Sequence, residues 1–305
     1  MIRPIRAGLH CIFGRMMRIL VNGSRSQLGR ALVRKQRDFE WTFLGREDLD
    51  MEKVSEISDV LDKREFDVFI NAAAYTAVDA AEDEPEKARK INALALQPIA
   101  EVCHKRNSLL IHISTDYVFG EKPAIPLRED QPTDPQGVYA RTKCEGEEIV
   151  QATCAQHIII RTSWLYGPDG VNFVKTMLKL SESKTALNVV FDQTGNPTLV
   201  DHLAEAIVQI VAAYSANPAI FPFGKYHYSN EGVGTWYDFA HAVFALSQKN
   251  MHLTPVHSEV FGAKAKRPAY SVLDKQKIKD TFGLAIPHWR DALAECLNAM
   301  RENND

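Results

Sequence analysis

The sequence predicts an α/β fold: a Rossmann-type doubly wound parallel sheet with a smaller C-terminal α/β lobe. Short apolar segments alternate with helical patterns from residue 18 to about residue 166, and the first of them runs into a glycine-containing turn and a helix. Such alternation is typical of a parallel sheet covered by helices on both faces. The pattern loosens beyond Tyr166. We therefore expect a Rossmann domain over 17–166 and a second lobe over 167–305, with some segments of 167–305 returning to the first domain.

The first sixteen residues stand apart from this pattern. They hold Arg3, Arg6 and Arg15 without an acidic residue, and the next residues begin the first strand. A targeting peptide would need an unbroken apolar stretch, which His10 interrupts here. We expect 1–16 to be a leader or disordered extension, or the result of a start codon placed upstream of the true one.

The first strand and its turn predict a dinucleotide site. Arg18–Asn22 is apolar, and Gly23-Ser-Arg-Ser-Gln-Leu-Gly29 leads into a helix, so that backbone N–H groups and the helix dipole face a pyrophosphate. Ser26 stands where the usual Gly-x-x-Gly-x-x-Gly pattern has its middle glycine; its side chain narrows the approach to the phosphates, while its hydroxyl can donate to them. The expected cofactor contacts here are Gly23, Arg25, Ser26, Gln27 and Leu28.

The next two strands extend this site. After the strand Trp41–Leu44, Arg46 and Arg25 favour a 2′-phosphate and hence NADPH, while Glu47 and Asp48 leave NADH open. We expect Asp50 in the same site. After the strand 67–71, the small side chains of Ala72, Ala73 and Ala74 allow the backbone to lie against a flat ring or a ribose.

The fourth strand and the following helix carry the predicted chemistry. The apolar strand Leu109–Ile113 is followed by Ser114 and Thr115, and Tyr139 and Lys143 share one face of a helix. A phenol has a pKa of about 10, and an adjacent ammonium favours its ionised form. Tyr139 can then protonate a carbonyl oxygen, held by Thr115, while a hydride reaches the carbon.

Further helices are predicted over 82–106, over 139–154 and after Thr235, which can serve as an N-cap. A fifth strand is predicted over 157–161. Trp236 and Tyr237 are expected to pack in the core or between the lobes rather than to bind a ligand.

Composition excludes several other classes. The 305 residues are 45% hydrophobic and 25% charged, which is enough for a full core in two closely joined lobes. The net charge is −3 without a basic block, so no nucleic-acid partner is expected. No apolar run approaches the roughly 18 residues of a membrane span. The five cysteines, at 11, 103, 144, 154 and 296, lack paired or metal-like spacing, which is typical of a cytoplasmic protein.

Several motifs together resemble one enzyme family. They are Asn-Ala-Ala-Ala-Tyr-Thr-Ala-Val-Asp (71–79), Ser-Thr-Asp-Tyr-Val-Phe (114–119), Tyr139 with Lys143, Arg-Thr-Ser-Trp-Leu-Tyr (161–166), Asn-Phe (172–173) and Asp-Gln-Thr-Gly-Asn-Pro-Thr (192–198). In order and approximate spacing they resemble dTDP-4-dehydrorhamnose reductase, an extended short-chain dehydrogenase/reductase. Ser26 is the clearest departure from the family pattern.

The resemblance implies roles for individual residues. Thr115, Tyr139 and Lys143 would be catalytic, and Asn92 a buried polar anchor. Residues near the sugar would be Thr76, Val78, Asp116 and Trp164, and Arg267 would lie near the nucleotide diphosphate.

The implied reaction is reduction, by NADPH or else NADH, of the C4 ketone of a dTDP-4-keto-6-deoxyhexose, with dTDP-L-rhamnose as product. Two alternatives stay open: a ketoreductase for another nucleotide deoxysugar, and an NADP-binding regulatory subunit of methionine adenosyltransferase, which has the same fold. The matches at 76–79 and at Trp164 favour the enzyme. The sequence predicts no metal site from its own acids and histidines, but it leaves open a homodimer and Mg²⁺ held at its interface.

Overall fold

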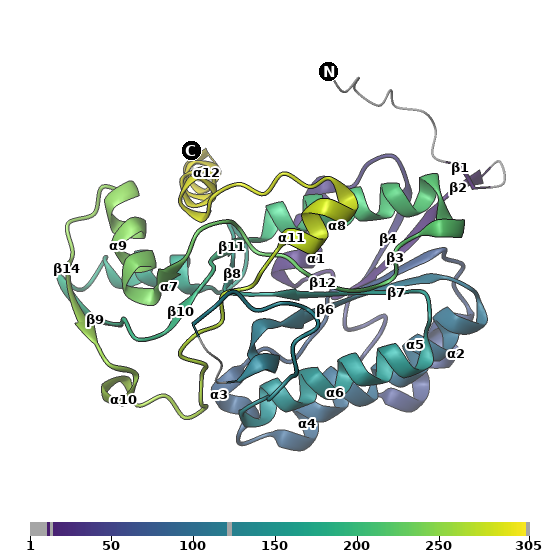
Figure 1. The fold of residues 1–305 in the computed structure, drawn as a ribbon, viewed down its shortest axis with the longest axis horizontal. Helices are drawn as coiled ribbons and strands as arrows, with labels where there is room; N and C mark the ends of the chain where they lie inside the picture. Colours follow the sequence, from purple (N-terminus) through teal and green to yellow (C-terminus); the bar gives the residue numbers. More distant parts are fainter. Residues whose placement is uncertain (1–10, 13–14, 121–123, 303–305) are drawn as a thin grey trace.

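A six-stranded parallel sheet forms the centre of the structure, in the order β12-β7-β6-β5-β3-β4 (Figure 1). The computed structural model describes residues 11–12, 15–120 and 124–302. The strands are β1 Cys11–Ile12, β2 Arg15–Met16, β3 Arg18–Asn22, β4 Glu40–Leu44, β5 Val68–Asn71, β6 Leu109–Thr115, β7 His157–Thr162, β8 Leu165–Tyr166, β9 Ala186–Val190, β10 Thr194–Gly195, β11 Thr198–Leu199, β12 Gly224–His227, β13 Gly234–Thr235 and β14 His252–Val256. This sheet confirms the predicted α/β class.

Helices cover both faces of the sheet, as Figure 1 shows. The α-helices are α1 Gln27–Lys35, α2 Ile57–Asp62, α3 Val78–Ala81, α4 Pro85–Arg89, α5 Leu96–Lys105, α6 Gly137–Thr153, α7 Phe173–Leu180, α8 Val200–Ala216, α9 Trp236–Leu246, α10 Ser258–Phe261, α11 Gln276–Phe282 and α12 Trp289–Glu302. Helices α1, α8 and α11 pack on one face, and α2, α5 and α6 pack on the other.

The strands read as continuous apolar runs because their alternate side chains enter two different cores. In β7, Ile158 and Ile160 join the core beneath α1 and α8, while Ile159 joins the core beneath α5 and α6. In β5, Ile70 and Phe69 divide in the same way. Burial on both faces therefore explains why neither strand shows the apolar–polar alternation of a half-exposed strand.

The helical pattern predicted over 82–106 is interrupted. After α4, one π-helical turn spans Lys90–Leu94 before α5 begins, and α4 itself starts at Pro85. The turn carries buried Asn92, whose side chain accepts from Tyr75 N at 2.8 Å and donates to Tyr75 O at 3.1 Å and to Thr142 Oγ1 at 3.2 Å. Asn92 therefore ties the segment after β5 to α6, where the predicted catalytic residues lie.

Two parts of the chain beyond residue 167 return to the central sheet. Strand β12 pairs with β7, and α8 and α11 cover one face. The remaining elements form a lobe at the left of Figure 1, with the short parallel pair β14 and β9 and a core built from α7, α9 and α12.

Most of the leader predicted over 1–16 lies outside the described residues. Within it, β1 and β2 form an antiparallel pair. Among the helices of the described chain, none is long and apolar enough to cross a membrane.

Candidate active site

The carboxyl ends of four neighbouring strands border one cavity of about 530 Å³. From β3, the chain first adds β4 on one side of the sheet and then adds β5, β6 and β7 on the other side. The order of strand addition therefore reverses between β3 and β5. Ligands of open α/β sheets bind in the crevice at such a reversal. The cavity wall includes residues that follow β3, β5, β6 and β7, and Trp236 from the second lobe.

The turn after β3 is shaped for close backbone approach. Gly23 has φ +75°, and a Cβ on it would lie 2.7 Å from Ala73 N, so only glycine fits. Ser26 caps α1, because its Oγ accepts from Gly29 N at 3.0 Å. The hydroxyl oxygen is thus used by the cap, and its proton is left to donate toward the cavity. Leu28 and Gln27 complete this side of the wall.

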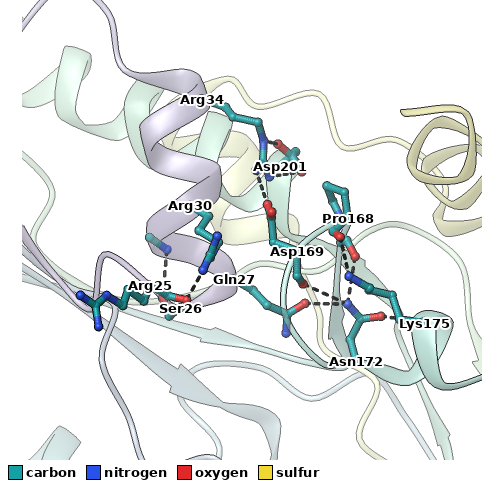
Figure 2. Close-up of polar contacts among 12 residues, drawn as sticks. Arg25, Ser26, Gln27, Arg30, Arg34, Pro168, Asp169, Asn172, Lys175 and Asp201 are labelled. Atoms are coloured by element: carbon teal, nitrogen blue, oxygen red, sulfur yellow. Dashed lines mark hydrogen bonds and ion pairs between the residues drawn. The ribbon is translucent and has the colours of Figure 1, made fainter. Parts of the chain in front are cut away.

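Figure 2 shows how the turn is joined to the second lobe. Gln27 Oε1 accepts from Asn172 Nδ2 at 3.0 Å, and Asn172 Oδ1 caps α7 by accepting from Lys175 N at 3.1 Å. Arg34 on α1 pairs with Asp201 at 2.9 Å and with Asp169. These contacts hold loop 167–172 over the turn, where Gly170 and Val171 line the cavity. Sequence reasoning missed this loop because no local pattern shows which distant helix it contacts.

The segment after β5 forms a second wall. Ala72 N donates to Asn22 Oδ1 at 3.1 Å, and Ala73 N donates to Asn71 Oδ1 at 3.2 Å. Ala72, Ala73 and Ala74 all border the cavity, and their small side chains leave room for a flat group against the backbone.

The three predicted catalytic residues meet in this cavity. Thr115 ends β6, and its hydroxyl donates to Asp116 Oδ1 at 3.1 Å and also hydrogen-bonds the Tyr139 side chain. Tyr139 and Lys143 lie one turn apart on α6 and both line the cavity. Lys143 Nζ donates to Ile113 O at 2.6 Å and lies 3.3 Å from His112 Nε2.

The electrostatics of Tyr139 differ from the sequence expectation. An adjacent ammonium was expected to lower the pKa of Tyr139, but burial raises it to about 12. The Lys143 amine is turned toward Ile113 O and His112, and burial lowers its own pKa to about 8. Tyr139 is therefore a protonated phenol in this structure, which suits a proton donor.

The residues predicted to lie near the sugar also border the cavity. Thr76 is exposed and Val78 half-buried, while Asp116 is buried and the burial raises the pKa of its carboxyl to about 7. Trp164 is half-buried and stacks on Trp236, with ring centroids 3.6 Å apart. Trp236, expected only to pack between elements, both packs there and lines the cavity.

The predicted 2′-phosphate residues lie around an adjoining hollow of about 530 Å³ that includes Arg25, Arg46 and Asp50. Each arginine already has acidic partners: Arg25 pairs with Glu47 at 2.5 Å, and Arg46 pairs with Asp50 at 3.4 Å and with Glu52. Only Arg25 borders both the hollow and the main cavity.

Arg267 does not line the cavity of the three predicted catalytic residues. It borders a second cavity of about 710 Å³, formed largely by α7, β9 and α10, which shares Trp236 with the first. Its guanidinium pairs with Asp79 at 2.7 Å, the residue after Val78. Arg267 also hydrogen-bonds the side chain of Tyr117, whose ring packs edge-on against Tyr139 with centroids 5.9 Å apart, so it lies where the two cavities adjoin.

Within 11–12, 15–120 and 124–302, no group of three or more His, Cys, Asp or Glu residues is arranged to hold a metal ion. The comparisons below give no support for the Mg²⁺ that the sequence left open.

Residues 17–302 match the family described as RmlD substrate binding domain. The chain is 40% identical to the spore coat polysaccharide biosynthesis protein SpsK of Bacillus subtilis (strain 168), over 92% of this chain and 97% of that protein. It is 38% identical to the dTDP-4-dehydrorhamnose reductase of Aggregatibacter actinomycetemcomitans, over 91% and 97%. A solved dTDP-4-dehydrorhamnose reductase of Bacillus anthracis str. Ames, in complex with NADP, superimposes with a TM-score of 0.88 at 32% identity, over 93% of this chain and 100% of that one.

Proposed function

Because the chain belongs to the RmlD substrate binding domain family, we propose that it is an NAD(P)H-dependent dTDP-4-dehydrorhamnose reductase. It reduces the C4 ketone of a dTDP-4-keto-6-deoxyhexose, and dTDP-L-rhamnose is the expected product. One observation carries the assignment: a single cavity brings Thr115, Tyr139 and Lys143 together with the turn at Gly23. The family match and the relatives confirm the family resemblance found in the sequence.

The cavity fits a dinucleotide. The glycine turn leaves no room for a Cβ, the first turn of α1 opens toward the cavity, and three alanines form a flat wall. Asp116 Oδ2 and Thr162 Oγ1 are buried without a hydrogen-bond partner among the described residues, and both residues border the cavity. Ser26, Gln27 and Leu28 would hold the pyrophosphate, Ala72 to Ala74 the adenosine side, and Lys143 the nicotinamide ribose.

Side chains of the protein supply the proton for the reduction. A bound nicotinamide supplies the hydride. Tyr139, which burial keeps protonated, donates its hydroxyl proton to the carbonyl oxygen of the sugar, and Thr115 orients that oxygen when its own hydroxyl proton turns from Asp116 Oδ1. Loop 167–172 and the stacked tryptophans limit the access of water to the reacting carbon.

The second cavity offers room for the rest of the substrate. It opens beyond Trp236, and Arg267 is a cation on its wall. A guanidinium there can form charge-assisted hydrogen bonds with a diphosphate. We assign the sugar to the first cavity, against Thr76, Val78, Asp116 and Trp164, and the nucleotide to the second.

NADPH is the proposed preferred cofactor. Arg25 and Arg46 flank the hollow next to the turn, and a 2′-phosphate can compete with their present carboxylate partners because exposed ion pairs contribute only about 0–1 kcal/mol. The regulatory-subunit alternative and the ketoreductase for another deoxysugar are not favoured, since dTDP-4-dehydrorhamnose reductases recur among the relatives.

Purified protein incubated with dTDP-4-keto-L-rhamnose and each reduced nicotinamide tests the proposal. We expect loss of nicotinamide absorbance and formation of dTDP-L-rhamnose, faster with NADPH. Protein that binds NADPH but oxidises none of it in the presence of this sugar would refute the proposed reaction. Product analysis by NMR reports the configuration at C4, so a different sugar epimer would also be detected.

A further inference from the structure

His112 lies in β6 beneath the catalytic residues, and only 1% of its surface is exposed. Its Nδ1 is 3.0 Å from Asn71 Nδ2, and its Nε2 is 3.3 Å from Lys143 Nζ. Burial alone, the larger of its causes, keeps the pKa of His112 well below its ordinary range, so the ring is neutral. A neutral imidazole has one N–H donor and one acceptor nitrogen. One of its two neighbours must therefore accept a hydrogen bond.

Asn71 cannot be that neighbour. The Ala73 N–H is shared between Asn71 Oδ1 at 3.2 Å and Asn22 Oδ1 at 3.3 Å, and the contact with Asn71 Oδ1 turns the Asn71 amide nitrogen toward His112. Rotating the amide by half a turn would place its NH₂ group against the Ala73 N–H. The orientation of a side-chain amide follows from such a network. His112 Nδ1 is thus the acceptor, and the ring proton is on Nε2, facing Lys143.

Lys143 can accept that proton only as a neutral amine, because an ammonium has no lone pair. The amine can still donate to Ile113 O at 2.6 Å. The titratable groups around it are His112 on β6, Tyr139 and Glu147 one turn away on either side on α6, and Asp116 beyond Tyr139.

Glu147, which would favour an ammonium, is already engaged elsewhere. It pairs with Arg161 of β7 at 2.6 Å and accepts from Ser114 Oγ at 2.5 Å. Burial also acts on Lys143, lowering its pKa to about 8. The hydrogen-bond geometry and the burial of Lys143 therefore both favour its neutral amine over the ammonium.

We propose that His112 is a positioning residue: in the tautomer fixed by Asn71, it stabilises the neutral amine of Lys143 relative to the ammonium when no cofactor is bound. Lys143 gains a proton when its amine turns from His112 toward acceptor oxygens in the cavity. This inference rests on the proposed function only in taking Lys143 as a catalytic group. It adds that the charge of Lys143 depends on the two buried side chains behind it.

The tautomer can be read directly in cofactor-free protein labelled with ¹⁵N-histidine. The ¹⁵N chemical shifts of an imidazole identify which ring nitrogen is protonated, and His112→Gln or, if that variant does not fold, Asn71→Asp assigns the signals. We expect the neutral ring with its proton on Nε2 at about pH 9, above the pKa of about 8 that burial gives Lys143 and below the roughly 10.4 of an unperturbed lysine. A proton on Nδ1, or a doubly protonated ring, would overturn the proposal.

The charge of Lys143 is tested by ¹³C-lysine NMR titration of three variants. Asn71→Asp accepts from Nδ1–H and reverses the tautomer, and His112→Gln can turn a carbonyl oxygen toward Lys143. Both should raise the pKa of Lys143 by about 0.5–1 unit, the equivalent of one neutral hydrogen bond. Ser108→Ala, which removes a buried hydroxyl bonded to Phe66 O at 3.1 Å just before β6, should not. If the pKa of Lys143 rose in Asn71→Asp but not in His112→Gln, the added negative charge of the aspartate would explain the rise. That result would refute the proposal.

These measurements need no substrate, so they fail independently of the proposed reaction. A fully active enzyme with the other tautomer would refute only the role of His112. A protein with the expected tautomer that retained its turnover as Lys143→Met would instead remove Lys143 from the mechanism.

Discussion

Trp164 stacks face to face on Trp236, with ring centroids 3.6 Å apart and ring planes within 8° of parallel. The pair joins the end of β7 to the start of α9, and both residues line the cavity that holds Tyr139. Trp164 has φ 45°, and a Cβ added to Gly195 would come within 2.8 Å of its ring. The ring is therefore held between a glycine backbone and a second indole, with an edge left for the cavity.

This arrangement predicts the effect of Trp164→Ala. Trp164 is part of the wall assigned to the sugar, so loss of about 0.5–1.5 kcal/mol of apolar contact with the sugar should raise KM for the keto sugar about 2–10-fold. Stability should fall by less than the 3–5 kcal/mol typical of a buried core ring, because Trp164 is only half-buried. Steady-state kinetics and thermal melting measure both, and Trp164→Phe is the matched control. A strongly lowered melting temperature with normal kinetics would show that Trp164 is purely structural.

Tyr139→Phe should lower kcat about 10²–10⁴-fold, the usual contribution of a positioned acid, since the phenylalanine keeps the ring but cannot donate a proton. NADPH affinity should change little. Fluorescence titration of NADPH serves as the control for folding. Turnover within a few-fold of the parent would exclude Tyr139 as the proton donor.

The sheet could be predicted from the sequence because each central strand is a short apolar run between turns, as in Leu109–Ile113. The shared placement of Tyr139 and Lys143 could be predicted because they are separated by one helical turn, and both line the cavity; their catalytic roles stay predictions. Both predictions rest on short stretches of sequence, and neither depends on contacts between distant parts of the chain.

Three features of the site could not be predicted from short stretches of the sequence. Trp236 has the sequence context of a core aromatic, and only the packing of α9 brings it to the cavity. Arg46 was expected to face a phosphate, but the sequence does not show that Asp50 and Glu52 pair with it. Lys143 was expected to lower the pKa of Tyr139, yet burial outweighs it, and burial depends on the whole fold.

The preference between NADPH and NADH should depend on the ion pairs of Arg25 and Arg46. We expect a higher kcat/KM with NADPH than with NADH. Arg46→Ala should reduce the ratio about 10-fold or more, because a hydrogen bond to a charged group contributes about 1.5–3 kcal/mol. Glu47→Gln, which frees Arg25 from its 2.5 Å partner, should increase the ratio. A parent enzyme that prefers NADH would contradict the assignment of both arginines.

Glu147→Gln should destabilise the protein by about 3–5 kcal/mol, because it leaves the fully buried Arg161 guanidinium without its counter-charge. Glu145→Gln on the same helix removes the exposed partner of Arg89 and should change stability little, because solvent screens an exposed ion pair. Urea unfolding of the two variants compares them directly. Equal losses would show that burial of the Glu147–Arg161 pair has no special role in holding α6 against β7.

Asp116 should give the protein a pH-dependent stability between about pH 4 and about pH 7. Burial raises the pKa of its carboxyl from 3.8 to about 7, so across this window the folded protein binds a proton that the unfolded chain has released. The free energy of unfolding must then fall as pH rises and level off above the folded pKa. Asp116→Asn keeps the shape without a titrating proton, so its unfolding free energy should fall less steeply than the parent's over the same window. Other titrating groups cancel in this comparison, and identical slopes would mean that Asp116 is ionised throughout.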